Sequence, residues 1–291
     1  MPDTTRSPVS VVVATRDRVD ELRRTLNHLS SLEPRPPVVV VDNASKDGTA
    51  EAVRTEFPEV TLVRLGRNIG CAARNTGVAH TNTPYVAFSD DDSWWAPGAL
   101  ERAAGAFRDH PRLGLVAAAI LVGDEARADP VNRKLLESPL DPADDLPGPR
   151  VMGFLACACV VRRAAFTQVG GFDPLLFFGG EETLLAQDLA ARGWGLSHMP
   201  QVYAHHHPSE ARPPPEWRHT LEKRNALWTV WLRRRPRVVL THTARIALSA
   251  LRDARSRRAL CAATALVPEI LAARRRLPAT VERDLSLLER T

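Results

Sequence analysis

The sequence lacks the features that mark secreted, disulfide-rich and membrane-spanning proteins. Only four of its 291 residues are cysteines and no two of them form a CxxC pair, so a disulfide framework is not indicated. No segment approaches the roughly 18–20 consecutive apolar residues of a membrane span. Residues 1–18 do not combine a basic segment with an apolar core, so we expect no secretory signal in them. We therefore expect a cytoplasmic protein with reduced thiols.

Aromatic residues are scarce as well. They make up 5% of the sequence, and no motif of a nucleic-acid-binding fold is present, so we expect no nucleic acid partner. The chain does have 44% hydrophobic and 25% charged residues, which is ordinary for a globular protein. A chain of this length can bury the core of one large α/β domain, with or without a smaller appendage.

Negative charge is scarce in the C-terminal part of the chain. Residues 212–291 hold 18 Lys and Arg against 7 Asp and Glu, a net charge of +11, whereas residues 1–211 have a net charge of −6. A basic extension favours an anionic partner, such as a membrane surface or a phosphorylated acceptor. Its apolar stretches, residues 238–251 and 259–273, are bounded by arginines. They could lie on the anionic inner face of the cell membrane, or pack on the rest of the chain or on another subunit.

Short apolar β-branched runs alternate with helical patterns in the first hundred residues. The runs that predict strands are residues 9–14, 38–42, 61–65 and 85–89. The segments between them that predict helices are residues 17–32, 49–57 and 70–80. This alternation is typical of βαβ units in a mostly parallel, doubly wound (Rossmann-like) sheet. In such an α/β sheet, ligands bind beyond the carboxyl ends of the strands.

The rest of the chain predicts a second group of elements and a helical C-terminal region. Helices are expected over residues 97–110 and 182–192, and extended segments over residues 113–122, 154–161 and 194–203. In the extended run 154–161, alternation would put Cys157 and Cys159 on one face. The proline-rich segments 123–149 and 208–215 predict an irregular excursion and a linker, and the chain looks helical from residue 216 onward.

Three adjacent carboxylates, Asp90, Asp91 and Asp92, directly follow the strand predicted over residues 85–89. Three negative charges at one strand end repel one another unless a positive charge neutralises them. Mg²⁺ or Mn²⁺ can do so, since either ion is coordinated by carboxylate and phosphate oxygens at the same time. In an extended segment Asp90 and Asp92 would point to the same side. A solvated acidic turn or a helix N-cap cluster is the alternative.

Polar residues also follow the second predicted strand and accompany the helix predicted over residues 70–80. Asp42 and Asn43 could bind a nucleobase or ribose, although the same residues are good turn and helix-cap formers. Arg74 could pair with a phosphate or hold an acidic loop, and a surface arginine on a helix is the alternative.

Two further motifs lie in the second half of the chain. Glu181 and Glu182 stand at the start of a predicted helix, where the helix dipole favours them and where one of them could act as a general base. His205, His206 and His207 close an extended run, and alternation puts His205 and His207 on one side. Imidazole can complete a metal shell, whereas a solvated histidine loop is the alternative.

Taken in this order, the motifs resemble those of the family 2 glycosyltransferases, in particular bacterial rhamnosyltransferase-like members. The similarity spans about residues 8–232 and includes the segments VVVVDNASKDGT, YVAFSDDD and GGEETLLAQDLAARGW. The resemblance implies a GT-A fold, in which a nucleotide-binding α/β half and an acceptor-binding half share one sheet. It implies a catalytic domain in residues 1–210, with halves at about 8–100 and 101–210, and a basic helical extension in residues 211–291.

The resemblance also implies roles for single residues. Glu182, or Glu181 beside it, would be the catalytic base. We favour Glu182, which occupies the position where the family usually has Asp and whose side chain is one methylene longer than that of Asp. Asp90 and Asp92 would bind Mn²⁺ or Mg²⁺, with His205 near the metal. The nucleotide-sugar donor would contact Ala14, Thr15, Arg16, Asp42, Asn43, Asn68, Arg74, Asn75, Asp90 and Asp91.

The implied reaction is a single displacement with inversion. The base would deprotonate an acceptor hydroxyl, and the metal would neutralise the leaving nucleoside diphosphate. The acceptor would be a lipid-linked intermediate, a cell-surface polysaccharide, a glycolipid or a natural product. Trp94 and Trp95 could form an apolar wall for sugar or acceptor, and ordinary packing is the alternative.

Two other functions compete with this interpretation. A sugar nucleotidyltransferase would need a glycine-rich loop near the N-terminus, and the segment VSVVVATRDR has none. A non-catalytic sugar-nucleotide-binding or scaffold protein would not need the carboxylates that are intact here, Asp90, Asp92 and Glu182.

Overall fold

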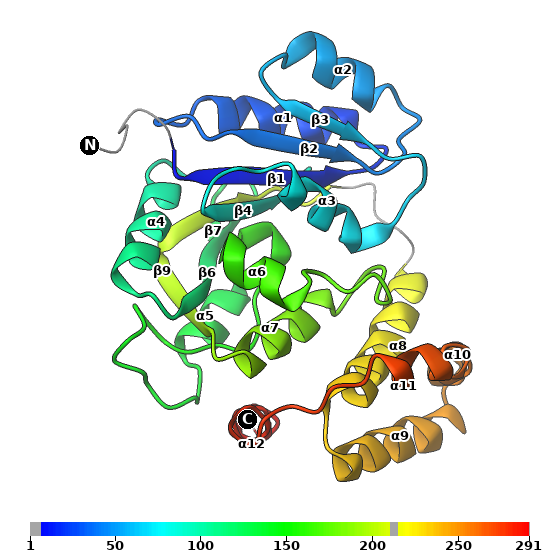
Figure 1. Ribbon diagram of the computed structural model, residues 1–291. Helices are drawn as coiled ribbons and strands as arrows, with labels where there is room; N and C mark the ends of the chain where they lie inside the picture. Colours follow the sequence, from blue (N-terminus) through cyan, green and yellow to red (C-terminus); the bar gives the residue numbers. More distant parts are fainter. Residues whose placement is uncertain (1–6, 210–214, 291) are drawn as a thin grey trace.

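Parallel strands form the first half of the sheet, as the alternation of strands and helices predicts. The structure is a computed structural model and describes residues 7–209 and 215–290. The first strands pair in parallel in the order β3-β2-β1-β4 (Figure 1). Their bounds are β1 Val9–Thr15, β2 Val38–Asp42, β3 Thr61–Arg64 and β4 Tyr85–Asp90. The valines of β1 and β2 are buried, which suits strands of a parallel sheet covered on both faces.

Helices cover both faces of this half of the sheet. Their bounds are α1 Val19–Ser30, α2 Thr49–Glu56 and α3 Ala73–Ala79. Three leucines of α1 at helical spacing pack with the valines of β1 that face this helix. On the opposite face, α3 packs so closely that a Cβ atom at Gly77 would lie 2.4 Å from Val12 Cγ1. Gly77 therefore allows α3, which carries Arg74 and Asn75, to lie directly on the sheet.

The second half of the sheet is mixed rather than parallel, and it continues the first half without a break. From β4 the order runs β8-β6-β9-β5, with β7 paired to β6. β8 is antiparallel to both of its neighbours, whereas β6 and β9 are parallel. The strands are β5 Ser93–Trp95, β6 Leu113–Val122, β7 Arg127–Ala128, β8 Cys159–Arg162 and β9 Gly195–His206. The helices between them are α4 Ala99–Asp109, α5 Pro130–Leu136, α6 Arg163–Val169 and α7 Glu181–Ala191.

Two of the expectations for this half are wrong. The segment 123–149 contains α5 and is not wholly irregular. The strand expected over residues 154–161 is replaced in part by a 3₁₀ turn at Ala156–Ala158, and only the residues after it are extended. The turn breaks the alternation, so Cys157 and Cys159 join core clusters on opposite sides of the sheet. An apolar run alone does not reveal such a turn.

Within residues 215–290 the C-terminal extension is helical, as expected, and packs back on the rest of the chain (Figure 1). The helices are α8 Pro215–Arg233, α9 Pro236–Ala250, α10 Ala254–Thr264, α11 Val267–Ala272 and α12 Ala279–Leu288. Trp228 of α8 shares a core cluster with Leu184 of α7, and Arg233 donates to both carboxylate oxygens of Asp188. No helix among the described residues is long and apolar enough to cross a membrane. The linker expected over residues 208–215 lies mostly outside the described residues.

Candidate functional site

The three adjacent aspartates lie at the carboxyl edge of the sheet, where β4 ends and the chain turns into β5. The turn is closed by Ser93, whose Oγ accepts a hydrogen bond of 2.7 Å from the Asp90 backbone N–H. β1 runs beside β4 and β2 runs beside β1, so Ala14 is in register with Asp90 and Thr15 with Asp42. The carboxyl ends of β1, β2 and β4 therefore bring these polar residues to one edge of the sheet.

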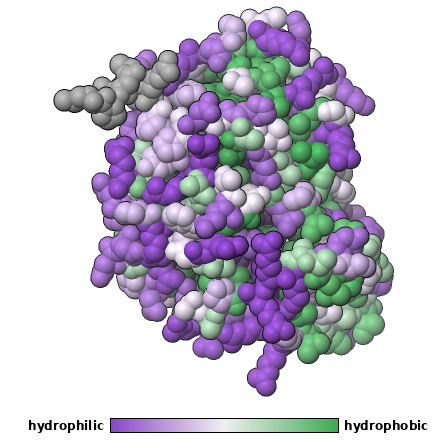
Figure 2. Space-filling model, in the orientation of Figure 1, coloured by the Kyte–Doolittle hydropathy of each residue, from purple (hydrophilic) through white to green (hydrophobic). Residues whose placement is uncertain are grey.

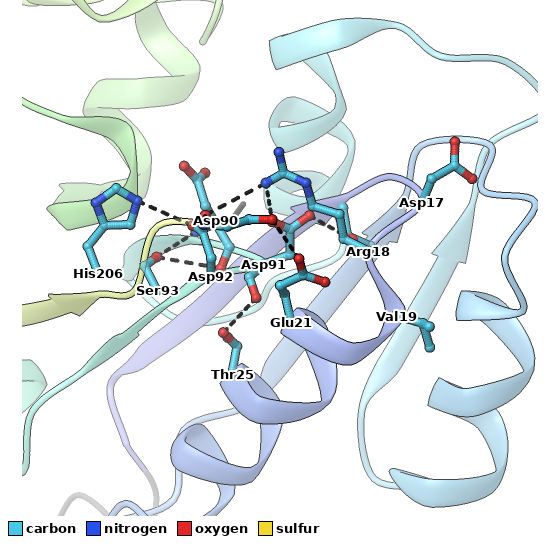
Figure 3. A network of polar contacts seen from close by, with 12 residues as sticks. Asp17, Arg18, Val19, Glu21, Thr25, Asp90, Asp91, Asp92, Ser93 and His206 are labelled. Atoms are coloured by element: carbon cyan, nitrogen blue, oxygen red, sulfur yellow. Dashed lines mark hydrogen bonds and ion pairs between the residues drawn. The ribbon is translucent and has the colours of Figure 1, made fainter. Parts of the chain in front are cut away.

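Asp91 is buried and points toward the loop that joins β1 to α1 (Figure 3). Its carboxylate accepts hydrogen bonds from Thr15 Oγ1 at 2.9 Å and from Arg18 Nη1 at 3.1 Å. Its backbone carbonyl accepts one from Thr25 Oγ1 at 2.8 Å. Burial raises the pKa of Asp91 to about 7, against the opposing charge of Arg18. The Asp91 side chain therefore holds the β1–α1 loop, and its expected contact with the donor stays a prediction.

Asp92 is also buried, but on the side of the turn that faces the end of β9. It accepts a hydrogen bond from the Ser209 backbone N–H at 3.1 Å, and His206 Nε2 lies 3.4 Å from its Oδ1. Arg18 Nη1 lies 3.7 Å from its Oδ2. Burial alone would raise the pKa of Asp92, but contacts with His206 and Ser209 and the charge of Arg18 lower it on balance. Asp92 is thus held as a carboxylate.

The histidine that lies beside Asp92 is His206, and not His205, the residue expected near the metal. β5 and β9 pair antiparallel with Trp94 opposite His205 and Ser93 opposite His206. Because neighbouring residues of a strand point to opposite faces, His205 lies on the other side and stacks on the Trp94 ring, with centroids 5.7 Å apart. Burial lowers the pKa of His205, which favours its neutral form.

The two tryptophans considered for the acceptor wall belong to the packing of this region. Trp95 is 1% exposed and lies in a core cluster that also contains residues of α4. Trp94 is half-buried and stacks on His28, with ring centroids 4.1 Å apart, as well as on His205. The alternative of ordinary packing therefore accounts for both side chains.

Arg74 of α3 links the aspartate turn to the start of α7. It donates a hydrogen bond to Asp90 Oδ1, and its Nη1 lies 4.0 Å from Glu181 Oε1. The Arg74 side chain is 11% exposed and the Asp90 side chain 35% exposed. Residues from the two halves of the sheet thus meet in one polar cluster, with Asp90 at its open side.

The paired glutamates at the start of α7 have raised pKa values. Burial raises the pKa of Glu182 to about 7, with a further contribution from the charge of Glu181. Burial also raises the pKa of Glu181, against the charge of Arg74 and backbone N–H groups. A carboxyl group with a pKa near neutral is suited to act as a general base.

Several buried polar atoms around this cluster lack a hydrogen-bond partner. Among the described residues these include Asp42 Oδ2, Arg74 Nε and Glu181 Oε2. Asp42 is fully buried, and the nearest opposite charge to its Oδ2 is Arg64 Nε at 3.6 Å. Because buried polar groups are normally paired, atoms of this kind indicate places where a bound molecule would complete the network.

The side chains of the asparagines predicted to bind the donor form hydrogen bonds with backbone groups. Asn43 bridges Ile69 N and Gly70 O, at 2.8 and 3.2 Å. Asn75 Oδ1 accepts from Phe172 N at 2.9 Å, and its Nδ2 donates to Phe172 O at 2.8 Å. Asn68 Oδ1 likewise accepts from Gly70 N at 2.9 Å. These three side chains shape the loops of the site, while Arg16 lies at the surface in an ion pair with Asp17.

The carboxylate oxygens of the aspartate turn are the donor atoms that a metal ion could use in this cluster. No group of three or more His, Cys, Asp or Glu side chains within residues 7–209 and 215–290 is arranged to hold a metal by itself. Asp90 and Asp92 nevertheless supply two carboxylates at one turn. Mg²⁺ is commonly bound by one or two carboxylates together with substrate phosphates, so this donor set fits a cation that binds with a diphosphate.

Sequence reasoning missed three residues of this region, Arg18, His206 and Ser209. Each acts across a long sequence separation: Arg18 contacts an aspartate 73 residues away and Ser209 one 117 residues away. Arg18 stands in the segment TRDR, from which Thr15 and Arg16 but not Arg18 are predicted to bind the donor. His206 stands in the histidine motif, in which His205 is the residue predicted near the metal, and no local pattern distinguishes Arg18 and Ser209 from ordinary surface residues.

Solved structures show which fold this sheet and its helices form. S. aureus TarS 1–349 in complex with UDP-GlcNAc matches with a TM-score of 0.59 and 20% identity, over 76% of this chain and 66% of that chain. The mannosyltransferase PcManGT from Pyrobaculum calidifontis, in complex with GDP-Man and Mn²⁺, matches with a TM-score of 0.56 and 20% identity. That match covers 98% of this chain and 87% of the other. The fold is GT-A, as the motifs predict.

The family follows from sequence similarity. Residues 10–170 match the family described as Glycosyl transferase family 2. The N-acetylglucosaminyl-diphospho-decaprenol L-rhamnosyltransferase of Mycobacterium tuberculosis is 30% identical over 235 aligned residues, covering 68% of this chain and 75% of that protein. The pre-mycofactocin glycosyltransferase of the same species is 33% identical, over 70% of this chain but only 44% of that protein. The chain belongs to glycosyl transferase family 2.

Proposed function

We propose that the chain transfers a sugar from a nucleotide diphosphate sugar to an acceptor hydroxyl, with inversion at the anomeric carbon. The observation that carries the proposal is the cluster of Asp90, Arg74 and Glu181, which joins a donor-side carboxylate to the paired glutamates of α7. The relatives support it, since solved structures of this fold contain UDP-GlcNAc or GDP-Man.

In this mechanism Glu182 accepts the proton of the acceptor hydroxyl. Its pKa of about 7 lets it exist as a carboxylate at neutral pH and still be basic enough to take a proton. The hydroxyl oxygen then attacks the anomeric carbon, and the bond from that carbon to the diphosphate breaks. Arg74, whose Nε has no hydrogen-bond partner among the described residues, would donate to the negative charge that develops on the diphosphate. Asp42 would accept hydrogen bonds from the nucleoside through its unpaired Oδ2.

Asp90 and Asp92 are the residues that would hold Mn²⁺ or Mg²⁺ together with the diphosphate. A bound divalent cation would supply electrostatic stabilisation of the leaving group. His206 lies beside Asp92 Oδ1 and the Ser209 N–H donates to Asp92 Oδ2, so the carboxylate keeps one orientation. The relative PcManGT was solved with Mn²⁺, which supports a cation in this place.

Metal-dependent release of nucleoside diphosphate tests the proposal. Purified protein is incubated with Mn²⁺ or Mg²⁺ and a panel of UDP-, dTDP- and GDP-sugars. We expect one donor to be hydrolysed slowly, and we expect Asp92→Ala to lower this rate by at least about 100-fold. Asp144→Ala, which removes an exposed carboxylate outside the site, is the matched control and should keep the rate.

Other outcomes of the same panel separate the rival functions. Donor binding in thermal-shift measurements, without turnover even in the presence of lipid-linked acceptors, would support the scaffold function. Release of inorganic pyrophosphate from a nucleoside triphosphate and a sugar phosphate would support the nucleotidyltransferase function. An equal rate with Asp92→Ala and in EDTA would contradict the metal role of Asp92.

We further propose that the acceptor is lipid-linked and that the enzyme works on the anionic inner face of the cell membrane. On α9 and just beyond it, Leu240, Leu248 and Leu251 are 70%, 65% and 76% exposed. Arginines stand beside them, and the sequence has no Asp or Glu between residues 235 and 252. The printed name of the mycobacterial relative includes a diphospho-decaprenol acceptor, which supports this choice.

The arginines of this surface are exposed and available to lipid phosphates. Arg237, Arg245 and Arg252 are exposed, and none forms an ion pair with another described residue. Figure 2 shows hydrophobic residues gathered over the C-terminal helices, at the lower right of the view. Exposed leucines flanked by arginines are typical of helices that lie in a membrane interface.

Vesicle binding tests this surface. We expect Leu240→Ser/Leu248→Ser to reduce co-sedimentation with anionic phospholipid vesicles by about 10-fold or more, since each buried leucine contributes about 1.5–3 kcal/mol. Leu136→Ser, which replaces a leucine 53% exposed on α5, is the matched control and should bind as the wild type does. Donor hydrolysis should be unchanged in both. Equal binding of all three proteins, or concentration-dependent self-association lost in the double variant, would contradict the membrane role.

A further inference from the structure

The loop before α7 connects the catalytic glutamates to two distant parts of the chain. On one side, Phe177 O accepts a hydrogen bond of 2.7 Å from Cys71 N, at the start of the segment that carries Arg74. On the other side, the loop lies against α8 of the C-terminal extension. The position of this loop therefore determines where α7 begins, and with it the backbone of Glu181 and Glu182.

A single side chain of α8, Asn225, holds this loop. Asn225 is fully buried, and its Nδ2 lies within hydrogen-bond distance of three carbonyl oxygens. These belong to Leu176 at 2.7 Å, Phe178 at 2.9 Å and Gly179 at 2.6 Å. An amide nitrogen has two hydrogens, so the carbonyls share them. The opposite amide orientation would put an oxygen against the carbonyls, and Oδ1 instead accepts from Arg224 Nε at 3.0 Å.

One peptide unit carries the effect of Asn225 to the glutamates. The peptide between Phe178 and Gly179 presents its C=O to Asn225, and its N–H, which belongs to Gly179, lowers the pKa of Glu181. The next residue, Gly180, caps α7 with a φ of +88°, and a Cβ atom there would lie 3.6 Å from Asn225 Cβ. Rotation of this peptide would change both the helix start and the electrostatics of the glutamate pair.

We propose that Asn225 is a positioning residue for the glutamate pair, so that the C-terminal extension completes the active site. This inference rests on the proposed function of Glu182 as the base. Leu176 O also accepts from the Phe178 N–H at 2.6 Å, so loss of Asn225 would chiefly leave the carbonyls of Phe178 and Gly179 without this donor, and the loop would move to find other partners. Asp42 and Asp90, the donor-side carboxylates, stand at the ends of β2 and β4 rather than on this loop. The carbonyls that Asn225 holds do not include that of Phe177, the loop residue that accepts from Cys71 N, so donor binding should be preserved.

The experiment compares Asn225→Ala with Arg233→Met. Both variants weaken contacts of α8, because Arg233 donates to Asp188 in the middle of α7, away from the loop. For Asn225→Ala we expect kcat to fall by about 10–100-fold with the donor KM within about twofold, since small misplacements of catalytic groups have effects of this size. For Arg233→Met we expect a lower Tm and an unchanged kcat of the folded protein. If Asn225→Ala does not fold, Asn225→Ser, which keeps one donor, replaces it.

Carboxyl titration followed by NMR gives a readout that does not require turnover. We expect Asn225→Ala to shift the titration midpoints of Glu181 and Glu182, and Arg233→Met to leave them unchanged. Unchanged midpoints and kcat in Asn225→Ala would overturn the inference, as would a raised donor KM at constant kcat. If the wild type turns over no donor, the proposed function fails, whereas the titration still decides whether Asn225 acts on the glutamates.

Discussion

Replacement of Glu182 by glutamine is expected to lower kcat by about 10²–10⁴-fold and to leave donor binding intact. Glutamine keeps the shape of the side chain but cannot accept the proton of the acceptor hydroxyl. In the wild type, kcat should rise with pH and level off above pH 7, because only the deprotonated Glu182 is a base and its pKa is about 7. The variant should retain no such pH dependence. Steady-state kinetics against pH, with donor binding measured by calorimetry, checks both expectations.

The same substitution should stabilise the folded protein at high pH. The pKa of Glu182 is about 7 in the folded state against an ordinary value of 4.5, so the folded state binds more protons between these values. The contribution of Glu182 to stability is therefore full below its ordinary pKa and is lost as pH rises through the folded pKa. Glutamine stays neutral at every pH, so the variant does not lose this stability as pH rises. We expect Glu182→Gln to have a higher Tm than the wild type at about pH 8, and a similar Tm near about pH 4.5.

Glu181→Gln serves as the matched control for the choice of base. Since the charge of Glu181 raises the pKa of Glu182, this variant should move the midpoint of the kcat–pH profile to lower pH. Its loss of kcat should be smaller than that of Glu182→Gln. A larger loss with Glu181→Gln would transfer the role of base to Glu181.

The parts of the fold that the sequence predicts are those governed by local patterns. The first four strands and the helices between them follow from runs of β-branched residues and from leucines at helical spacing in α1. The aspartate run after β4 lies at the carboxyl edge of the sheet for the same reason, because the end of a predicted strand fixes its place. The family motifs also predict that Arg74 and Glu181 belong to one site.

The rest depends on contacts between distant segments. Whether His205 or His206 faces Asp92 is decided by the pairing of β9 with β5, and a shift of one residue exchanges the two faces of a strand. The roles of Arg18 and Asn225 depend on which loops pack beside them, and neither residue type signals this in sequence. The resemblance to family 2 predicts which motifs contribute to the site. The structure shows which residues of these motifs lie next to one another.

Replacement of Arg74 should cause the second large loss of activity, because Arg74 contacts both the donor-side Asp90 and Glu181 of the glutamate pair. Arg74→Met leaves Asp90 and Glu181 without their shared cation. Breaking a buried ion pair costs about 3–5 kcal/mol, and we expect less here because the Asp90 side chain is 35% exposed. We expect a fall in kcat/KM of at least about 100-fold, since a donor to the leaving diphosphate is lost as well.

The pH profile separates this catalytic effect from a loss of stability. The positive charge of Arg74 lowers the pKa of Glu182, so its removal should move the midpoint of the kcat–pH profile upward. Arg74→Lys keeps the charge but cannot contact Asp90 and Glu181 with separate nitrogens, so it should restore the midpoint more than the rate. Arg112→Met removes an exposed ion pair with Asp145 far from the site and should change neither quantity. A wild-type midpoint in Arg74→Met would show that Arg74 and the glutamates act independently, and the cluster would then no longer support a single active site.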